Sequence, residues 1–236
     1  MIMNDVTCLI PSRLGSTRFF GKSLENINDD PMVVMVAKNA IKAFGKDNVV
    51  VLTDHKKIYD TCNKNSIRCE ITKSCNNATE RIFQYYEKIQ TEYIIELQGD
   101  EPLIFPEDLL LLYSGGKKTK NPTCIISPLH KSQINDENIC KAIVNKEQDK
   151  IFYATRFSLD TNFRHVGVYM YDKKQLCDFN KKETNIELVE NIHPLKWIEL
   201  GYTYNCAKIN HYTHGVDVPK DIFVVKTLLE YDTFKL

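Results

Sequence analysis

The first half of the sequence alternates short apolar runs with longer amphipathic segments. The apolar runs are short enough to be buried strands, and the segments between them carry apolar residues at helical spacing, as Val33, Val36, Ala37 and Ala40 do. Strands separated by helices in this way form βαβ units. We therefore predict an α/β fold with a mainly parallel sheet flanked by helices. The predicted strands are 6–10, 49–53, 67–71 and 93–97, and the predicted helices are 31–44, 56–63, 79–89 and 106–112.

The pattern changes from Thr123 onward. Apolar runs become shorter and lie closer together, which favours antiparallel strands added to the edge of the sheet. An amphipathic segment at 186–200 contains Pro194, which should kink or divide a helix. The length fits one domain over residues 1–236, of which about 123–212 would form a smaller antiparallel part for acceptor binding or dimerisation. The later predicted strands are 123–127, 141–144, 151–155, 166–171 and 204–209, and a helix at 219–231 closes the chain.

Charge and cysteine usage exclude several classes of protein. Thirty-one basic residues balance thirty-one acidic ones, so binding of nucleic acid through bulk charge is not expected. No apolar run approaches about 18 residues and no leader-like segment opens the chain, so we expect neither export nor a membrane span. The eight cysteines are scattered without a CxxC pair, which is typical of free thiols in a reducing cytoplasm.

A loop directly after the first strand, residues 11–22, has the composition of a phosphate cradle. Its glycines allow close approach of backbone N–H groups, its hydroxyls donate hydrogen bonds, and Arg13, Arg18 and Lys22 neutralise negative charge. A basic surface loop is the alternative. The phosphate loop of kinases and GTPases is excluded, because Gly15 and Gly21 are one residue too far apart and no helical pattern begins at Lys22.

Two aspartates are candidates for a metal site. Asp100 follows the strand at 93–97, between Gly99 and a turn that contains Pro102, at the edge of a parallel sheet where ligands bind. A carboxylate there, facing the basic loop, could hold Mg²⁺, which takes one or two protein carboxylates and leaves its other positions to phosphate and water. Asp217 offers a second carboxylate. Each could instead be purely structural, as a turn aspartate at position 100 and a helix cap at position 217.

Six segments together resemble the CMP-Kdo synthetases, which are 3-deoxy-manno-octulosonate (Kdo) cytidylyltransferases. They occur in the family's order and span nearly the whole chain, and LQGDEP with the opening loop is the most specific combination. The segments are PSRLGSTRFFGK (11–22), NATERI (77–82), LQGDEP (97–102), Thr155-Arg156, RHVGVYMY (164–171) and GVDVPKD (215–221).

The resemblance implies a nucleotide-transferase fold, a homodimer, and transfer of CMP from CTP to the anomeric oxygen of an acid sugar with Mg²⁺ and release of pyrophosphate, for lipopolysaccharide or capsule biosynthesis. It also implies roles for individual residues. By motif match the nucleotide is bound by Pro11, Arg13, Ser16, Arg18, Lys22, Thr79, Arg81 and Gln98; the catalytic residues are Lys22, Arg13 and Asp100; the metal ligands are Asp100 and Asp217; and the acceptor is bound by Arg156, Arg164 and His165, the last also a candidate general base.

The chain departs from the family pattern near the acceptor. Only seven residues, 157–163, separate Arg156 from Arg164, His193 stands where the family has a Glu, and Phe19-Phe20 replaces Leu-Pro before Gly21. An amino-substituted Kdo, another ulosonate or nonulosonate, or a phosphonate therefore stays open as acceptor. Two further hypotheses are a nucleotidyltransferase that uses another base and a nucleotide-binding paralogue without catalytic activity.

Overall fold

The computed structural model describes residues 3–230 except 76, 146, 148, 182, 183 and 191, and leaves the side chains of 187, 188 and 193 undescribed. The chain divides into two compact units. Among the described residues, one unit holds those up to Leu110 together with 214–230, and the other holds Leu111–Thr213. The prediction of one domain over 1–236, in which about 123–212 would serve acceptor binding or dimerisation, stays a prediction.

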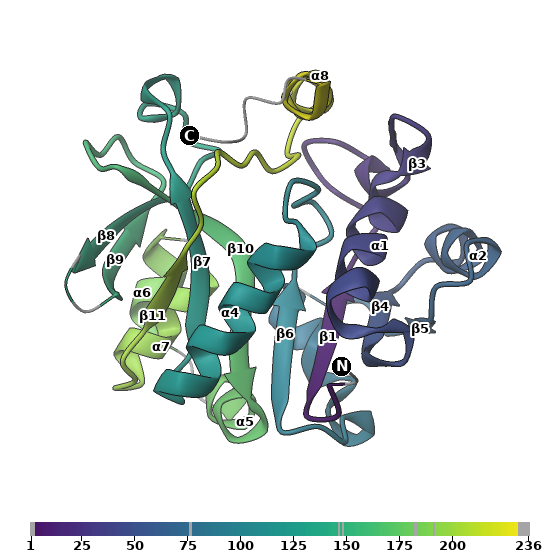
Figure 1. Ribbon diagram of the computed structural model, residues 1–236, viewed down its shortest axis with the longest axis horizontal. Coiled ribbons are helices and arrows are strands. Elements are labelled where there is room, and N and C mark those ends of the chain that lie inside the picture. The colour runs from purple at the N-terminus through teal and green to yellow at the C-terminus, as the bar shows by residue number, and fades with distance from the viewer. Residues whose placement is uncertain are drawn as a thin grey trace. The chain divides into compact units, whose positions relative to one another are not determined.

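The first unit is built on a parallel sheet. Its strands lie in the order β5-β4-β1-β6, and each neighbouring pair is parallel, as predicted (Figure 1). Because parallel strands end at the same edge, the loops that follow β1 and β6 emerge side by side. These strands are β1 (Val6–Pro11), β4 (Val49–Thr53), β5 (Cys69–Ile71) and β6 (Tyr93–Leu97).

The helices at 32–44, 56–64 and 78–83 pack on these strands, whereas the helix at 219–230 contacts the short strand at 26–27. In Figure 1, α1 crosses in front of β1, and Val33, Val36 and Ala37 of this helix are buried. Its N-cap is Pro31, without a side-chain hydrogen bond. The helices are α1 (Met32–Phe44), α2 (Lys56–Lys64), α3 (Ala78–Phe83) and α8 (Pro219–Glu230), with short 3-10 turns at Lys22–Leu24, Lys46–Asn48 and Tyr86–Lys88 and a small hairpin of β2 (Asn26–Ile27) and β3 (Asp30–Pro31).

The single helix predicted at 79–89 is wrong. The α-helix ends at Phe83, and the chain tightens because the backbone N–H of Tyr85 donates to the carbonyl of Ile82. This tighter turn buries the Tyr85 ring while its hydroxyl accepts a hydrogen bond from Arg68 at 2.8 Å. A tertiary contact therefore overrides the helical period of the sequence.

The second unit is mostly antiparallel, as predicted. Its strands lie in the order β10-β7-β11-β9-β8, and only β7 and β11 run parallel among the pairs described. The first residues of β10 also pair with β8, so the strands curve around a common core. They are β7 (Thr123–Pro128), β8 (Lys141–Asn145), β9 (Lys150–Thr155), β10 (Phe163–Asp172) and β11 (Asn205–Lys208).

Pro194 divides the amphipathic segment, which confirms the prediction at that position. The 3-10 turn that contains Pro194 separates two short helices, and Leu195 belongs to a buried cluster with Cys140 and with Ala154 of β9. A helix at 173–181 was not predicted, because its many charged and polar residues hide a narrow apolar stripe formed by Leu176 and Phe179. The elements are α5 (Lys173–Lys181), α6 (Asn185–Glu190), a 3-10 turn at His193–Leu195 and α7 (Lys196–Glu199), with a further 3-10 turn at Lys131–Gln133.

Helix α4 (Pro106–Thr119) runs seven residues beyond the predicted end at 112, and the boundary between the units falls within it. Among the residues that the structure describes, no helix combines the length and apolar character needed to cross a bilayer.

Candidate functional site

Three segments that are distant in sequence converge in the first unit. The first is the loop after β1, which begins at Ser12, whose N–H donates to the carbonyl of Leu52 on β4. The loop then turns back at Gly21, which has a φ of 77° that favours glycine, and its N–H donates to the carbonyl of Leu14. This turn directs the following residue, Lys22, back toward the strand ends.

The second segment follows β6 and lies close against the end of β1. A Cβ at Gly99 would come within 3.3 Å of the Pro11 carbonyl oxygen and 3.4 Å of the Ser12 side chain. A side chain at this position would have to displace the Pro11 carbonyl by a few tenths of an ångström, so glycine suits the close approach. Asp100 is thereby held next to the basic loop.

The third segment is the turn before α8. The N–H of Val216 donates to the carbonyl of Asp100 at 2.9 Å, so the backbones that carry Asp100 and Asp217 are joined directly. Two carboxylates that are far apart in the sequence therefore share one site.

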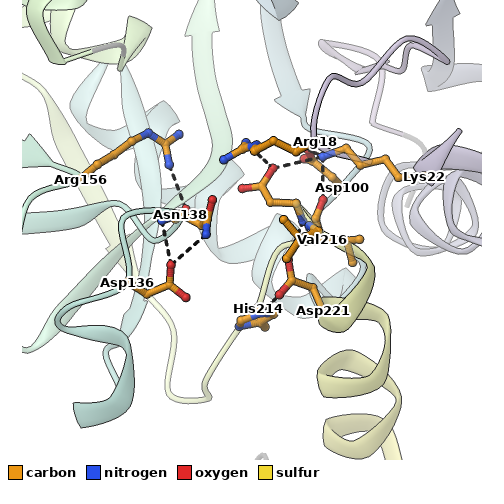
Figure 2. Close-up of polar contacts among 11 residues, drawn as sticks. Arg18, Lys22, Asp100, Asp136, Asn138, Arg156, His214, Val216 and Asp221 are labelled. Carbon is orange, nitrogen blue, oxygen red and sulfur yellow. Dashed lines mark hydrogen bonds and ion pairs between the residues drawn. The ribbon is translucent and has the colours of Figure 1, made fainter. Parts of the chain in front are cut away.

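The ammonium of Lys22 lies between these carboxylates (Figure 2). Its Nζ donates to Asp100 at 2.7 Å, to Asp217 at 3.2 Å and to the Val216 carbonyl at 2.6 Å, and the Arg18 guanidinium donates to Asp217 at 2.7 Å. Burial alone would lower the pKa of Lys22, but the charges of the two carboxylates and the hydrogen bonds to them raise it above its usual value. Lys22 is therefore charged at neutral pH.

This arrangement fits a divalent cation. Asp100 and Asp217 already approach one positive atom, Lys22 Nζ, from two segments, and carboxylate oxygens are the donors that Mg²⁺ prefers. Within the described residues there is no group of three or more acidic, His or Cys side chains that could hold a metal alone. The remaining positions of a cation here would fall to phosphate and water.

Asp221, in the first turn of α8, holds the turn that carries Asp217. One oxygen accepts the N–H groups of Asp217 at 2.8 Å and of Val218 at 2.9 Å, and the other lies 3.0 Å from Nε2 of His214. Burial would raise the pKa of the Asp221 carboxyl, but the hydrogen bonds from His214 and the two amides lower it overall. The sequence motif contains Asp221, but only its contacts indicate a role.

The other residues predicted to bind the nucleotide also lie in the first unit. Pro11 ends β1, Arg13 is exposed and Ser16 half-buried in the loop, and Gln98 follows β6. On α3, the hydroxyl of Thr79 lies 3.3 Å from a carboxylate oxygen of Glu96.

Arg81, also on α3, is 2% exposed. Its terminal nitrogens donate to Asp54 at 2.7 Å and to Thr72 at 2.5 Å. Its part in binding cytidine stays a prediction.

The residues predicted to bind the acceptor belong to the second unit. Arg156, at the end of β9, is half-buried and donates to the carbonyl of Asn138 at 2.9 Å (Figure 2), while Arg164, on β10, is buried and donates to the Thr213 hydroxyl. Next to Arg164, His165 shares a hydrogen bond of 2.8 Å with the hydroxyl of Tyr204.

His165 is neutral at physiological pH. Burial lowers its pKa to about 3, with smaller contributions from the charges of Arg164 and Arg156. A neutral, buried imidazole can donate or accept a hydrogen bond, but it offers no positive charge to a sugar carboxylate. A base with so low a pKa also removes protons poorly, so the burial of His165 does not favour it as a general base.

Sequence reasoning missed two residues beside Arg156. Lys141 on β8 is fully buried, and its Nζ donates to the carbonyls of Asp136 at 2.6 Å and Arg156 at 2.9 Å. Glu190 accepts hydrogen bonds from the hydroxyls of Tyr153 and Thr155. A charged residue at an inward position of an apolar strand was the available signal for Lys141.

Comparison with known proteins identifies the family. The family model described as cytidylyltransferase matches residues 7–207. The chain belongs to the cytidylyltransferases. A curated relative of this enzyme family, the 3-deoxy-manno-octulosonate cytidylyltransferase of Fusobacterium nucleatum, is 30% identical over 97% of this cytidylyltransferase and 98% of the relative. The mitochondrial 3-deoxy-manno-octulosonate cytidylyltransferase of Arabidopsis thaliana is 29% identical over 95% of this chain and 83% of its own length.

Solved structures agree with this cytidylyltransferase on the fold. A CMP:2-keto-3-deoxy-manno-octonic acid synthetase complexed with CTP matches with a TM-score of 0.87 and 24% identity, over 96% of this chain and 99% of that one. A putative glucose-1-phosphate thymidylyltransferase from Bacillus anthracis matches with a TM-score of 0.72 and 10% identity, over 98% of each chain. The α/β nucleotidyltransferase-like fold predicted from the sequence is thus confirmed.

Proposed function

We propose that this cytidylyltransferase transfers CMP from CTP to the anomeric oxygen of Kdo or a closely similar acid sugar and releases pyrophosphate. The convergence of Lys22, Asp100 and Asp217 on one point carries the proposal, because transfer of a nucleotidyl group needs cations and a metal-binding carboxylate pair at one place. Relatives that bear the 3-deoxy-manno-octulosonate cytidylyltransferase name over nearly their whole length support the substrates.

Catalysis in this proposal is mainly positioning and charge stabilisation. The sugar oxygen attacks the α-phosphorus in line with the departing pyrophosphate, so negative charge develops on the leaving group. Lys22 and Arg18, which now bind the carboxylates, together with Arg13 on the same loop, neutralise the triphosphate. Thr79, Arg81 and Gln98 are proposed to surround the cytidine, and Pro11 and Ser16 to bind the nucleotide as part of the loop after β1.

Mg²⁺ is the metal we propose, with Asp100 and Asp217 as its protein ligands. When bound, it polarises the phosphate and lowers the pKa of the attacking hydroxyl. The spacing of the two carboxylates around one positive atom supports this role.

The acceptor side of the proposal rests on the second unit. Arg156 and Arg164 are proposed to bind the sugar carboxylate, and neutral His165 to contribute a hydrogen bond. A homodimer, which the resemblance to the family implies, and a cytoplasmic location, which the scattered cysteines favour, complete the proposal. The short segment at 157–163 favours, as second candidate, a modified acceptor such as an amino-substituted Kdo.

Release of pyrophosphate tests the proposal. We expect release that requires CTP, Mg²⁺ and Kdo or an 8-amino-Kdo, with little release when ATP, GTP or UTP replaces CTP. Absence of release with every 2-keto-3-deoxy acid tested would exclude the proposed function, and release with another nucleotide alone would exclude the specificity for CTP.

A further inference from the structure

Asp217 lies outside the strands and helices, in the turn that precedes α8, so its position depends on that turn. That turn comprises residues 214–218, and it could adopt other conformations unless its backbone amides are held. Two of these amides, those of Asp217 and Val218, donate to one oxygen of Asp221 at 2.8 and 2.9 Å. The N–H of Asp217 itself is therefore fixed by a side chain one helical turn ahead.

The same carboxylate is held from its other side. Its second oxygen lies 3.0 Å from Nε2 of His214, at the start of the turn (Figure 2). Asp221 thus joins the first and the last residues of the turn, and it is 4% exposed, so water does not compete for these contacts. This closure fixes the direction in which the side chain of Asp217 leaves the backbone.

We propose that Asp221 is a positioning residue, which holds Asp217 in place to bind the metal and to receive Arg18 and Lys22. The inference rests on the proposed function, because it assigns Asp217 to the metal. Asp221 itself touches neither the metal nor the substrate. Its effect is transmitted through the backbone of residues 217 and 218.

The chain offers a matched control in α4. Both α4 and α8 begin with proline and carry a buried aspartate two residues later, Asp108 and Asp221. Asp108 accepts the N–H of Phe105 at 2.9 Å, so it also caps its helix. If only helix capping were lost, Asp108→Ala and Asp221→Ala should therefore change Tm and Mn²⁺ binding by similar amounts.

The decisive measurement is binding of Mn²⁺ to the CTP-loaded protein, with unbound Mn²⁺ counted by electron paramagnetic resonance and no acceptor present. We expect Asp221→Ala to weaken Mn²⁺ binding about tenfold, Asp108→Ala to leave it within about twofold, and both to lower Tm by similar amounts. Asp221→Asn retains an oxygen acceptor for both amides and should restore most of the affinity. Equal Mn²⁺ binding by the two alanine variants would overturn the proposal, and so would an Asp221→Asn variant as weak as Asp221→Ala.

His214→Ala covers the case in which Asp221→Ala does not fold. It keeps both amide bonds and the helix cap but frees the far oxygen of Asp221, and we expect Mn²⁺ binding to weaken about threefold. Unchanged binding would then overturn the proposal. Since these measurements need no turnover, failure of the wild-type protein to react with any acid sugar would reject the proposed function without deciding the role of Asp221.

Discussion

At the scale of single residues, Lys22 has two possible partners in the same site. Its ammonium now bonds both Asp100 and Asp217, the pair proposed for the metal, whereas its proposed partner in the reaction is the triphosphate. The nucleotide and the metal should therefore bind together, because phosphate oxygens draw Lys22 away as the cation takes its place.

The variant Lys22→Met tests this competition. Without the ammonium, two carboxylates lie close together and repel each other, so we expect free protein to bind Mn²⁺ about tenfold more tightly than the wild type in the absence of CTP. Lys38→Met, which breaks the exposed ion pair with Asp30, serves as control. If Lys22→Met and wild type bind Mn²⁺ equally, Lys22 does not compete with the metal.

His165 makes a second prediction at this scale, on stability. The unfolded chain takes up a proton at an ordinary pKa of about 6.5, whereas the folded protein does so only near pH 3, so the unfolded state binds more protons between these values. Stability therefore falls as the pH falls from about 6.5. Between pH 7 and pH 5 the wild type should lose about 2 kcal/mol more free energy of unfolding than His165→Gln, measured in urea. As a control, the exposed variant His130→Gln should lose as much free energy of unfolding as the wild type. Equal losses in the wild type and His165→Gln would contradict the lowered pKa of His165.

At the scale of elements, Lys141 joins the segment that carries Arg156, a residue proposed to bind the acid sugar, to the segment before β8. It reaches from β8 to the carbonyls of Asp136 and Arg156, and Arg156 in turn bonds the carbonyl of Asn138. These hydrogen bonds thus hold the end of β9 against the segment before β8.

Replacing Lys141 should act on the acceptor and spare the nucleotide. For Lys141→Met we expect the KM for the acid sugar to rise about tenfold, because Arg156 loses a fixed backbone, while the KM for CTP stays within about twofold. Lys131→Met, at an exposed position, should change neither. Equal rises in both KM values would indicate a general loss of structure and reject this role.

Local sequence patterns predicted an element correctly where the burial of its residues follows a single pattern along the whole element. All residues of the strands at 49–53 and 93–97 are buried, and both strands were predicted with the correct bounds. Pro194 correctly predicted the break in the amphipathic segment. The break after Phe83 was missed because it depends on Arg68, which lies on a different segment.

At the scale of the whole molecule, the sequence could place Lys22, Asp100 and Asp217 near strand ends but could not join them. Their meeting depends on Gly99, which lets the loops approach, and on the backbone bond between Val216 and Asp100. Asp221 was missed because its importance lies in bonds to backbone amides, which carry no sequence signal. Lys141 was missed although its charge on an otherwise apolar strand could have signalled it. The roles of the acceptor residues remain predictions.

Turnover by Asp100→Asn is the measurement that bears most directly on the central claim. The substitution keeps the shape of the side chain but removes the charge proposed to hold the metal, so kcat with CTP and Kdo should fall about a hundredfold or more, while CTP measured without metal still binds within about threefold of wild type. Asp30→Asn, which breaks only the exposed pair with Lys38, should turn over normally. An Asp100→Asn variant with kcat near that of the wild type would contradict the account.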